Sequence, residues 1–389
     1  MKHGWEYKKL GEVSEIVGGS TPKTSIDSYW GGEYPWVTPA ELNGAKYIDK
    51  TERTITDEAL AHTNLQLLPV GTVLLSSRAP IGKLAITKIP MYCNQGFKNI
   101  IPGDSLYNEF AYWYLTYKKD YIISLGRGAT FKEISKSITE KIPIPIPPLG
   151  EQKAICSLLD KLSLVIEKKK QQVKELDNLA QTIFYDMFGD PVENEKGFAI
   201  SSLNDICELI TDGTHQTPTY TEDTKNGFIF LSAKNVVGGF IDWTNVKYIP
   251  KELHTSLYAR LAPRRNDILL CKNGTTGIAA IVETDEVFDI YVSLGLLRLK
   301  DGYLPKYILY AINNPYTKQQ FDDSLKGVGV PNLHLGEIKK ARIIIPPLSL
   351  QQDFSVKVEF IERQKELINK SIAEVQTLFD SQMEYYFGE

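Results

Sequence analysis

Residues 144–152 read IPIPPLGEQ, and residues 343–351 read IIIPPLSLQ. The Pro-Pro-Leu triplet therefore occurs twice, 199 positions apart. Each copy opens a segment of 44 residues, 147–190 and 346–389, which ends in Phe-Gly and an acidic residue. Because self-similarity at a fixed offset is the signature of a repeated unit, the sequence predicts that the chain contains two copies of one unit.

Both segments carry apolar residues at alternating steps of four and three positions, the pattern of a heptad seam. Lys169 interrupts the first seam, and Lys365 and Gln382 interrupt the second. The predicted helix–helix seam residues are Ile155, Leu159, Leu162, Ile166, Val173, Leu176, Ile183, Phe354, Val358, Ile361, Ile368, Ile372, Val375 and Phe379. A seam of about five heptads indicates packing against an equally long partner, so the two helices are predicted to pair with each other. The alternative is that each helix packs only on its own domain.

The rest of the chain repeats more loosely. Similar stretches are GWEYKKLGEVSEIV and GFAISSLNDICELI, PWVTPAEL and IFLSAKNV, and VLLSSRAPIGKLAI and ILLCKNGTTGIAAI. The last pair predicts two apolar strands joined by a small polar turn. A helix rich in aromatic residues is expected later in each copy, at 110–124 and at 305–325.

The predicted fold class is α+β with an internal repeat. Two similar mixed α/β domains, 1–146 and 191–345, are separated by two long helices in segments 147–190 and 346–389. At about 1.5 Å per residue, each helix is expected to be ~57 Å long. Because the helices match closely and the domains have diverged, we expect the helices to form a fixed frame that holds two domains of different specificity.

The composition is that of a globular protein, with 42% hydrophobic and 24% charged residues. The net charge of −4, taken alone, argues against avid binding of nucleic acid. The excess of acidic residues lies mainly in segment 346–389, and the near-neutral remainder neither proves nor excludes a DNA-facing surface. The four cysteines stand far apart without a C-x-x-C pair, so buried reduced thiols are expected rather than disulfides or a zinc site. No apolar run reaches the roughly 18 residues that span a bilayer, and the first residues lack a signal-peptide core. A cytoplasmic protein with no membrane association is therefore expected.

The order of these features resembles the DNA-specificity subunit of type I restriction–modification systems over essentially the whole chain. The resemblance rests on the I-P-x-P-P-L-x-E-Q-x-x-I pattern that ends at Ile155, and on the Lys-rich seam that ends FYDMFGDP. The L-x-x-V-x-E-I-x-x-G opening of the first domain and the repeat of the whole unit complete it. No single motif is strong, but their order is specific.

The resemblance implies that each globular segment is a target-recognition domain that reads one half of a bipartite, asymmetric sequence in double-stranded DNA. The two long helices would pair antiparallel, set the spacing and dock two methyltransferase subunits, and restriction or translocase subunits can join that complex. Methylation would occur at N6 of adenine, with S-adenosylmethionine bound by the methyltransferase, so no cofactor is expected on this chain. A pseudo-two-fold axis between the domains would suit the dyads of duplex DNA.

Candidate DNA-binding residues are polar side chains in predicted loops, because Arg suits guanine and Asn or Gln suits adenine. In the first domain they are Ser20, Thr21, Lys23, Arg78, Gln95, Arg127 and Thr130. In the second domain they are Thr214, His215, Gln216, Lys234, Lys272, Asn273 and Asn332. For each of them, a solvated turn residue is the alternative interpretation.

Catalytic motifs are weak. NNPY at 313–316 resembles the N-P-P-Y loop with which adenine methyltransferases hold a flipped base. It lacks the second proline and falls in an aromatic-rich helical region, so a helix interruption explains it better. GGSTPKT (18–24) and RGATFK (127–132) do not fit the G-x-x-x-x-G-K-[ST] phosphate loop. A non-catalytic chain without a metal site is therefore predicted.

Two alternatives stay open. The specificity subunit of a related fused restriction system would still read DNA. A coiled-coil adaptor would have the same heptad seams but would show no sequence-dependent gain in DNA binding when a methyltransferase subunit is added.

Overall fold

The computed structural model describes the chain in three stretches, residues 4–128, 132–325 and 331–388. The chain divides into two compact units: unit 1 comprises residues 1–170 and 369–389, and unit 2 comprises residues 171–368. Each unit is built around its own hydrophobic cores. The unit, rather than the continuous segment of sequence, is therefore the structural module.

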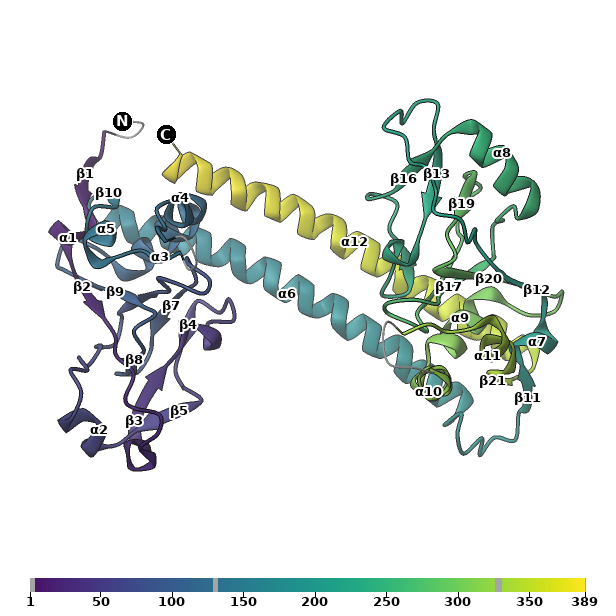
Figure 1. The fold of residues 1–389 in the computed structure, drawn as a ribbon, viewed down its shortest axis with the longest axis horizontal. Coiled ribbons are helices and arrows are strands. Elements are labelled where there is room, and N and C mark those ends of the chain that lie inside the picture. Colours follow the sequence, from purple (N-terminus) through teal and green to yellow (C-terminus); the bar gives the residue numbers. More distant parts are fainter. Residues whose placement is uncertain (1–3, 129–131, 326–330, 389) are drawn as a thin grey trace. The chain divides into compact units, whose positions relative to one another are not determined.

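Two long helices are shared between the units. Helix α6 (Leu149–Phe188) and helix α12 (Leu348–Phe387) are each uninterrupted over 40 residues (Figure 1). The first half of α6 and the end of α12 belong to unit 1, and the remaining halves belong to unit 2. All the predicted seam side chains are buried or half-buried.

Unit 1 is a mixed α/β structure. Its elements before α6 are β1 (Glu6–Lys9), α1 (Leu10–Val13), β2 (Ser14–Gly18), β3 (Trp30–Val37), β4 (Tyr47–Ile48), β5 (Arg53–Ile55), α2 (Asp57–Ala61), β6 (Val73–Leu75), β7 (Leu84–Thr87), β8 (Tyr92–Cys93), β9 (Lys98–Pro102), α3 (Asn108–Tyr117), α4 (Lys119–Ser124), α5 (Lys136–Glu140) and β10 (Pro143–Ile146). They form a five-stranded sheet β2-β9-β6-β7-β4, a three-stranded sheet β5-β3-β8 and a pair β1-β10.

Unit 2 repeats this plan. Its elements between the long helices are β11 (Ala199–Ser202), α7 (Leu203–Ile206), β12 (Cys207–Asp212), β13 (Phe228–Leu231), β14 (Val236–Val237), β15 (Phe240–Ile241), β16 (Lys247–Ile249), α8 (Lys251–Arg260), β17 (Ile268–Cys271), β18 (Ala279–Ile281), β19 (Phe288–Ile290), β20 (Leu294–Leu299), α9 (Pro305–Asn313), α10 (Pro315–Ser324), α11 (Leu335–Lys340) and β21 (Arg342–Ile345). Its sheets are β12-β20-β17-β18, β16-β13-β19, β14-β15 and β11-β21. The order β12-β20-β17-β18 matches the first four strands of the main sheet of unit 1, and the two three-stranded sheets also match, which confirms the internal repeat. The edge strand β4 of unit 1 has no counterpart in the four-stranded sheet.

The predicted strand–turn–strand motif is present in both units. Strands β6 and β7 pair antiparallel with Val73 opposite Ile86, and β17 and β18 pair antiparallel with Ile268 opposite Ile281. Every residue of β6 and β17 is buried. A strand covered on both faces reads as a continuous apolar run rather than as an alternating one, which explains the sequence pattern.

The aromatic-rich segments differ from the prediction, because each consists of two helices instead of one. In unit 2, α9 ends at Asn313 and α10 begins at Pro315, and the side chain of Asn314 caps α10 by accepting from the N–H of Tyr316. A proline lacks the N–H that would continue the first helix and favours the first turn of the second. The NNPY sequence is therefore a helix interruption, as predicted. In unit 1, α3 ends at Tyr117, and Lys118 separates it from α4.

The ends of the long helices pack by aromatic contacts. In unit 2, Phe188 near the end of α6 lies 4.9 Å from the ring centroid of Tyr307 in α9 and 5.3 Å from that of Phe354 near the start of α12. The two helices therefore run antiparallel there and contact each other, so the alternative in which each helix packs only on its own domain is wrong. In unit 1, Phe387 of α12 lies 5.5 Å from Phe110 of α3.

A buried glutamine anchors the start of each long helix. In α6, Nε2 of Gln152 donates to the carbonyls of Pro147 (2.8 Å) and Ser105 (2.9 Å), and its Oε1 accepts from the N–H of Tyr107 (2.7 Å). In α12, Gln351 contacts the carbonyl of Pro346 (2.9 Å) and the N–H of Leu304 (3.2 Å) in the same way. Gln152 and Gln351 stand 199 positions apart. The repeated Pro-Pro-Leu segment thus fixes each helix to its domain.

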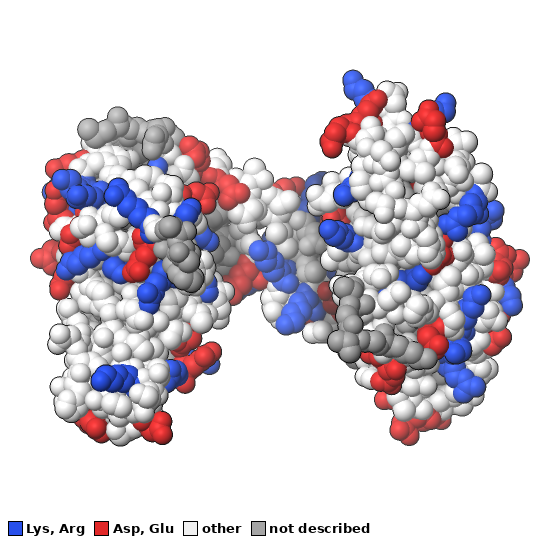
Figure 2. All heavy atoms as spheres, viewed as in Figure 1, with Lys and Arg blue, Asp and Glu red and all other residues white. Residues whose placement is uncertain are grey.

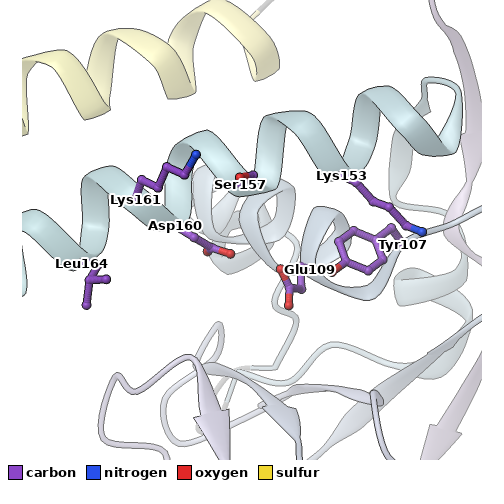
Figure 3. A pocket seen from close by; sticks show the side chains of 7 residues that line it. All are labelled: Tyr107, Glu109, Lys153, Ser157, Asp160, Lys161 and Leu164. Carbon is purple, nitrogen blue, oxygen red and sulfur yellow. The ribbon is translucent and has the colours of Figure 1, made fainter.

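Ion pairs also join each domain to its helix. In unit 1, Nζ of Lys46 contacts Asp160 of α6 and lies 3.2 Å from Oε2 of Glu109 in α3. Glu109 and Asp160 line a cavity of about 310 Å³ between α3 and α6 (Figure 3). Its other lining residues are Tyr107, Lys153, Ser157, Lys161 and Leu164. In unit 2 the polarity is the same, because Lys306 of α9 lies 2.7 Å from Glu362 of α12, so the domain again supplies the lysine and the long helix the carboxylate.

The four cysteines are free and buried, which confirms the expectation of reduced thiols. Burial raises the pKa of the thiols of Cys93, Cys156 and Cys207 to about 12 and that of Cys271 to about 11. In the three described stretches, no helix has the length and apolar character needed to cross a membrane.

Candidate nucleic-acid interface

The sheet order of unit 1 brings three loops to one place. Residue Lys98 at the start of β9 pairs with Gly18 at the end of β2, and Ser76 after β6 bridges to Phe97. The loop after β2, the loop after β6 and the loop before β9 therefore meet at one end of the sheet. These loops contain most of the candidates predicted for the first domain.

Glu133 is the centre of the polar cluster in unit 1. Its Oε1 lies 3.1 Å from Nζ of Lys98 and its Oε2 lies 3.8 Å from Nη1 of Arg78. Lys98 also donates to Oγ of Ser77 at 3.2 Å. The backbone of Arg127 exchanges hydrogen bonds of 3.1 and 3.0 Å with that of Glu133. The structure thus joins Arg78 and Arg127 through Glu133, a residue that the sequence analysis missed.

The recognition chemistry of this cluster differs between its members. The Arg78 side chain is 37% exposed, whereas that of Lys98 is only 14% exposed. Thr21 donates its Oγ1–H to Oε1 of the exposed Gln95, which joins the loop after β2 to the loop before β9. A guanidinium held by a carboxylate can donate two hydrogen bonds to a guanine edge, and an exposed amide can bind adenine. The mostly covered Lys98 holds Glu133 and Ser77 in place instead.

Unit 2 has a more buried cluster at the equivalent place. Nζ of Lys272, after β17, contacts Oδ2 of Asp212 at the end of β12, and the two side chains are 6% and 9% exposed. Oδ1 of Asp212 lies 3.2 Å from Nε2 of His215, whose side chain is 73% exposed. Arg260 donates to the backbone carbonyl of Asp212 at 3.0 Å. Asp212 and Arg260 were not among the predicted residues.

The register of the two sheets identifies equivalent positions. The N–H of Ile134 donates to the carbonyl of Ser77 at 3.1 Å, and the N–H of Leu333 donates to the carbonyl of Lys272 at 2.8 Å. Ser77 and Lys272 therefore correspond. So do the residues that follow them, Arg78 and Asn273, and those that precede the two donors, Glu133 and Asn332. Asn273 and Asn332 form a β-bridge to each other.

The lysine of each cluster comes from a different strand. In unit 1 it is Lys98 of β9. Its counterpart in unit 2 is Gly295 of β20, because Ile100 pairs with Val73 of β6 and Leu297 pairs with the equivalent Ile268 of β17. A side-chain carbon added at Gly295 would lie 3.6 Å from Cδ of Lys272. Each unit therefore places a lysine ammonium group at the equivalent site, but the lysine comes from β9 in unit 1 and follows β17, the counterpart of the neighbouring strand β6, in unit 2.

The loop that follows the first strand of the main sheet starts identically in both units. A Cβ at Gly19 would lie 2.0 Å from the carbonyl oxygen of Asn94, and one at Gly213 would lie 2.0 Å from that of Ile290. Only glycine allows so close an approach. The N–H of Ser20 then donates to the carbonyl of Cys93 at 3.0 Å, and that of Thr214 donates to Ile290 at 3.0 Å. The β2–β3 loop (19–29) and the β12–β13 loop (213–227) are thus held alike and differ in their side chains.

The remaining candidates lie around these clusters. Lys23 is exposed in the β2–β3 loop, and Gln216 donates its N–H to Oγ1 of the buried Thr214 at 3.2 Å. Lys234 is exposed in the turn after β13, beside the capping box of Ser232 and Asn235. Thr130 lies outside the described residues. Acidic and basic side chains are interspersed on the visible face of each unit (Figure 2). Over residues 4–128, 132–325 and 331–388, no group of three or more His, Cys, Asp or Glu residues could hold a metal ion.

The chain matches the family described as type I restriction modification DNA specificity domain twice, over residues 2–177 and 195–377. It belongs to this family. The type I restriction enzyme MjaIX specificity subunit of Methanocaldococcus jannaschii is 32% identical to it, over 94% of this chain and 89% of the relative. The EcoKI specificity subunit of Escherichia coli K12 is 21% identical, over 98% and 88%.

Solved structures of specificity-family chains share the fold. The S subunit of a type I restriction–modification system from M. genitalium superimposes with a TM-score of 0.59 at 16% identity, over 99% of this chain and 96% of that one. A chain from a structure on complex assembly and conformational transition of the type I R-M system gives 0.58 at 17% identity, over 99% and 98%. The prediction of a DNA-specificity subunit, which is a non-catalytic component, is confirmed by the family match and the curated relatives.

Proposed function

We propose that units 1 and 2 each read one half of a split, asymmetric sequence in double-stranded DNA. The observation that carries this proposal is the exchange of side chains at equivalent positions on one scaffold. Arg78 and Glu133 of unit 1 are replaced by Asn273 and Asn332 in unit 2, and the supporting lysine moves to another strand. Two copies of one framework with different polar ends suit two different half-sites.

The chemistry of each cluster suggests what each unit prefers. Arg78 offers the paired N–H groups that recognise O6 and N7 of guanine in the major groove. Asn273 and Asn332 offer amides, whose donor and acceptor match N6 and N7 of adenine. Gln95 in unit 1 can serve an adenine in the same way.

The long helices are proposed to set the distance between the half-sites. Asp177 of α6 and Lys365 of α12 form an ion pair, which shows the register of the helix pair in unit 2. The proposal includes two methyltransferase subunits docked on the helices, with restriction or translocase subunits added to that complex. S-adenosylmethionine would be bound by the methyltransferase, which would modify adenine at N6. We place this assembly in the cytoplasm.

A domain exchange tests the proposal. Residues 1–146 are replaced by the equivalent segment of a relative with a different target, and the complex with the cognate methyltransferase subunit is assayed by methylome sequencing. One half of the methylated motif should change, and the other half and the gap should stay the same. Exchange of residues 191–345 is the matched control and should change the opposite half. A change in both halves after one exchange would contradict independent reading, and DNA binding without any sequence preference would favour an adaptor.

A further inference from the structure

The three-stranded sheets of the two units carry a cation at the same register position. Arg53 on the edge strand β5 lies opposite Trp36 of β3, and Lys247 on the edge strand β16 lies opposite Phe230 of β13. Because the strand orders β5-β3-β8 and β16-β13-β19 correspond, Arg53 and Lys247 are equivalent residues. Neither was among the predicted DNA-binding candidates.

Each of these cations lies over an aromatic ring. Cζ of Arg53 is 3.5 Å from the ring centroid of Trp30, and Nζ of Lys247 is 4.1 Å from that of Tyr220. Each ring in turn packs edge-on against the aromatic residue of the central strand. Trp30 lies 5.0 Å from Trp36, and Tyr220 lies 6.1 Å from Phe230.

The two units assemble this arrangement from different parts of the sequence. Trp30 is the first residue of β3, whereas Tyr220 belongs to the β12–β13 loop. A simple copy of one sequence would have placed the ring at the same position in both units. The ring comes from different segments although the cations are equivalent. The contact was therefore not simply inherited with the repeat, and a common function explains it better.

The aromatic residues tie each cation to the loop that carries the candidate base contacts. In unit 1, Nε1 of Trp36 donates to the carbonyl of Ser20 at 3.0 Å, and Nε1 of Trp30 donates to that of Lys23 at 3.4 Å. In unit 2, the N–H of Thr221 donates to the carbonyl of Tyr248, beside Lys247, at 2.9 Å. Each exposed cation therefore flanks a loop held against the polar cluster.

The charges of these two cations are not neutralised by ion pairs within the described residues. Arg53 and Lys247 are exposed, and neither has a carboxylate within ion-pair distance in the described part of the chain. Other exposed cations do have such partners: Arg265 binds Asp285 at 2.7 Å. A ring beneath a cation holds the side chain in place without neutralising it. Less conformational freedom is then lost when an anion binds.

We propose that Arg53 and Lys247 each bind a phosphate of the DNA backbone beside the half-site read by their unit. This inference rests on the proposed function, in which each unit reads one half-site. Phosphate contacts fix the position of a protein on the duplex and carry no sequence information directly. The two residues thus position the β2–β3 and β12–β13 loops over the bases, and the loops and polar clusters select the sequence.

The test uses Arg53→Gln and Lys247→Gln in the complete complex with the cognate methyltransferase subunit. Each substitution should weaken binding to cognate and to unrelated duplex DNA by the same factor, roughly three- to tenfold at low salt. The plot of log affinity against log salt should become less steep by about 0.9. The methylated motif should not change. Arg53→Lys and Lys247→Arg retain the charge and should restore most of the affinity and the slope.

Lys88→Gln is the matched control, because Lys88 is also exposed and lies over a ring, that of Tyr47, at 4.3 Å. Tyr47 contacts Glu109 of α3, away from the recognition loops, so this substitution should leave affinity and salt slope unchanged. Unaltered affinity and slope in both Gln variants would overturn the inference. So would a changed motif, which would indicate base contacts, or loss of the methyltransferase subunit, which would indicate protein docking. In each of these cases a domain exchange that still alters one half-site would leave the proposed function standing.

Discussion

Lys272 and Asp212 form an ion pair within unit 2 in which both side chains are almost completely buried. Removing two charges from water costs several kcal/mol per ion, and mutual attraction offsets this only with good geometry and further hydrogen bonds. The second oxygen of Asp212 has such a partner in His215. A buried ion pair often adds little net stability compared with apolar residues of the same size. Because this pair lies beside the recognition loop, we infer that it orients His215 and the loop.

Lys272→Met should destabilise unit 2 by about 3–5 kcal/mol, because it leaves the Asp212 carboxylate buried without its partner. Urea unfolding of the purified chain measures the loss. The double variant Lys272→Met/Asp212→Asn should recover most of the stability and still relax the half-site read by unit 2. Lys98→Met is the control in unit 1. Its partner Glu133 is 38% exposed, so the cost there should be about 1 kcal/mol or less. Equal unfolding midpoints for Lys272→Met and the parent chain would contradict the assignment.

The junction of α3 and α6 should make unit 1 sensitive to acid. Burial alone would raise the pKa of Glu109, but the hydrogen bond from Tyr47 and the charge of Lys46 hold that pKa below its ordinary value. Glu109 therefore binds a proton more weakly in the folded chain than in the unfolded chain. Its contribution to stability is present above the ordinary Glu pKa of about 4.3 and is lost as the pH falls through the lower folded pKa.

Lys46→Met should lower the stability of unit 1 by roughly 1.5–3 kcal/mol at pH 7, since charged hydrogen bonds of that order are lost. The difference from the parent chain should shrink as the pH falls below about 4, because the carboxylate first becomes protonated in the unfolded chain and then, at lower pH, in the folded chain. Denaturant unfolding between pH 3 and pH 7 measures it. Lys136→Met removes an exposed pair with Glu140 and should change stability by no more than about 0.5 kcal/mol. A constant difference across this pH range would show that Glu109 is not involved.

The sequence predicted the frame of this molecule well because a heptad seam is a local, periodic signal. It could not predict the register of the helix pair, which depends on which residues of α6 and α12 face each other, such as Asp177 and Lys365. The long helices also end on aromatic residues that pack on the other domain, as Phe188 does on Tyr307. The sequence does not show that each helix packs at its far end on the other domain, because an apolar residue at the end of a heptad seam could contact either domain.

The candidate site was predictable only in part, for a similar reason. Turn chemistry locates Arg78 and Asn273 in loops, but the carboxylates that hold the clusters, Glu133 and Asp212, lie far away in the sequence and look like ordinary surface acids. Lys272 looked like a loop residue and is buried, because the register of β17 and β20 sets it over Gly295. Sheet register, which a single sequence does not show, decides which polar residues meet.

The glutamines that anchor the helices offer a third prediction. Gln152→Leu should cost about 2–3 kcal/mol, because it leaves the part-buried N–H of Tyr107 and two carbonyls without partners. Gln351→Leu should cost less, since Gln351 makes one hydrogen bond fewer to the surrounding backbone. Thermal unfolding of both variants compares them. Gln171→Leu is the control, because this exposed side chain within α6 donates only to Glu175 one turn further on, and it should cost no more than about 0.5 kcal/mol. A smaller loss for Gln152→Leu than for Gln351→Leu would contradict this ranking.

The helix pair should act as the ruler between the half-sites. Asp177 lies beside Lys365, so counting back seven residues along α6 and forward seven along α12 places Lys170 opposite Ile372. One heptad inserted after Lys170 and another before Ile372 keeps both seams in phase and lies clear of the hydrophobic cores of the two units. The pair should lengthen by ~10 Å at about 1.5 Å per residue.

An extension of this size corresponds to about three base pairs at 3.4 Å each, so the double-insertion variant should methylate the same two half-sites with a gap about three base pairs longer. The domains must also follow a turn of roughly 100°, since B-DNA repeats every 10–10.5 base pairs, and some loss of activity is therefore expected. Insertion of four residues at the same two positions introduces a stutter that locally unwinds the helix pair and should lower both helix stability and methylation. Methylome sequencing of each variant gives the gap directly. An active double-insertion variant with an unchanged gap would mean that the spacing is set elsewhere, because no shift of register can hide seven added residues in both helices.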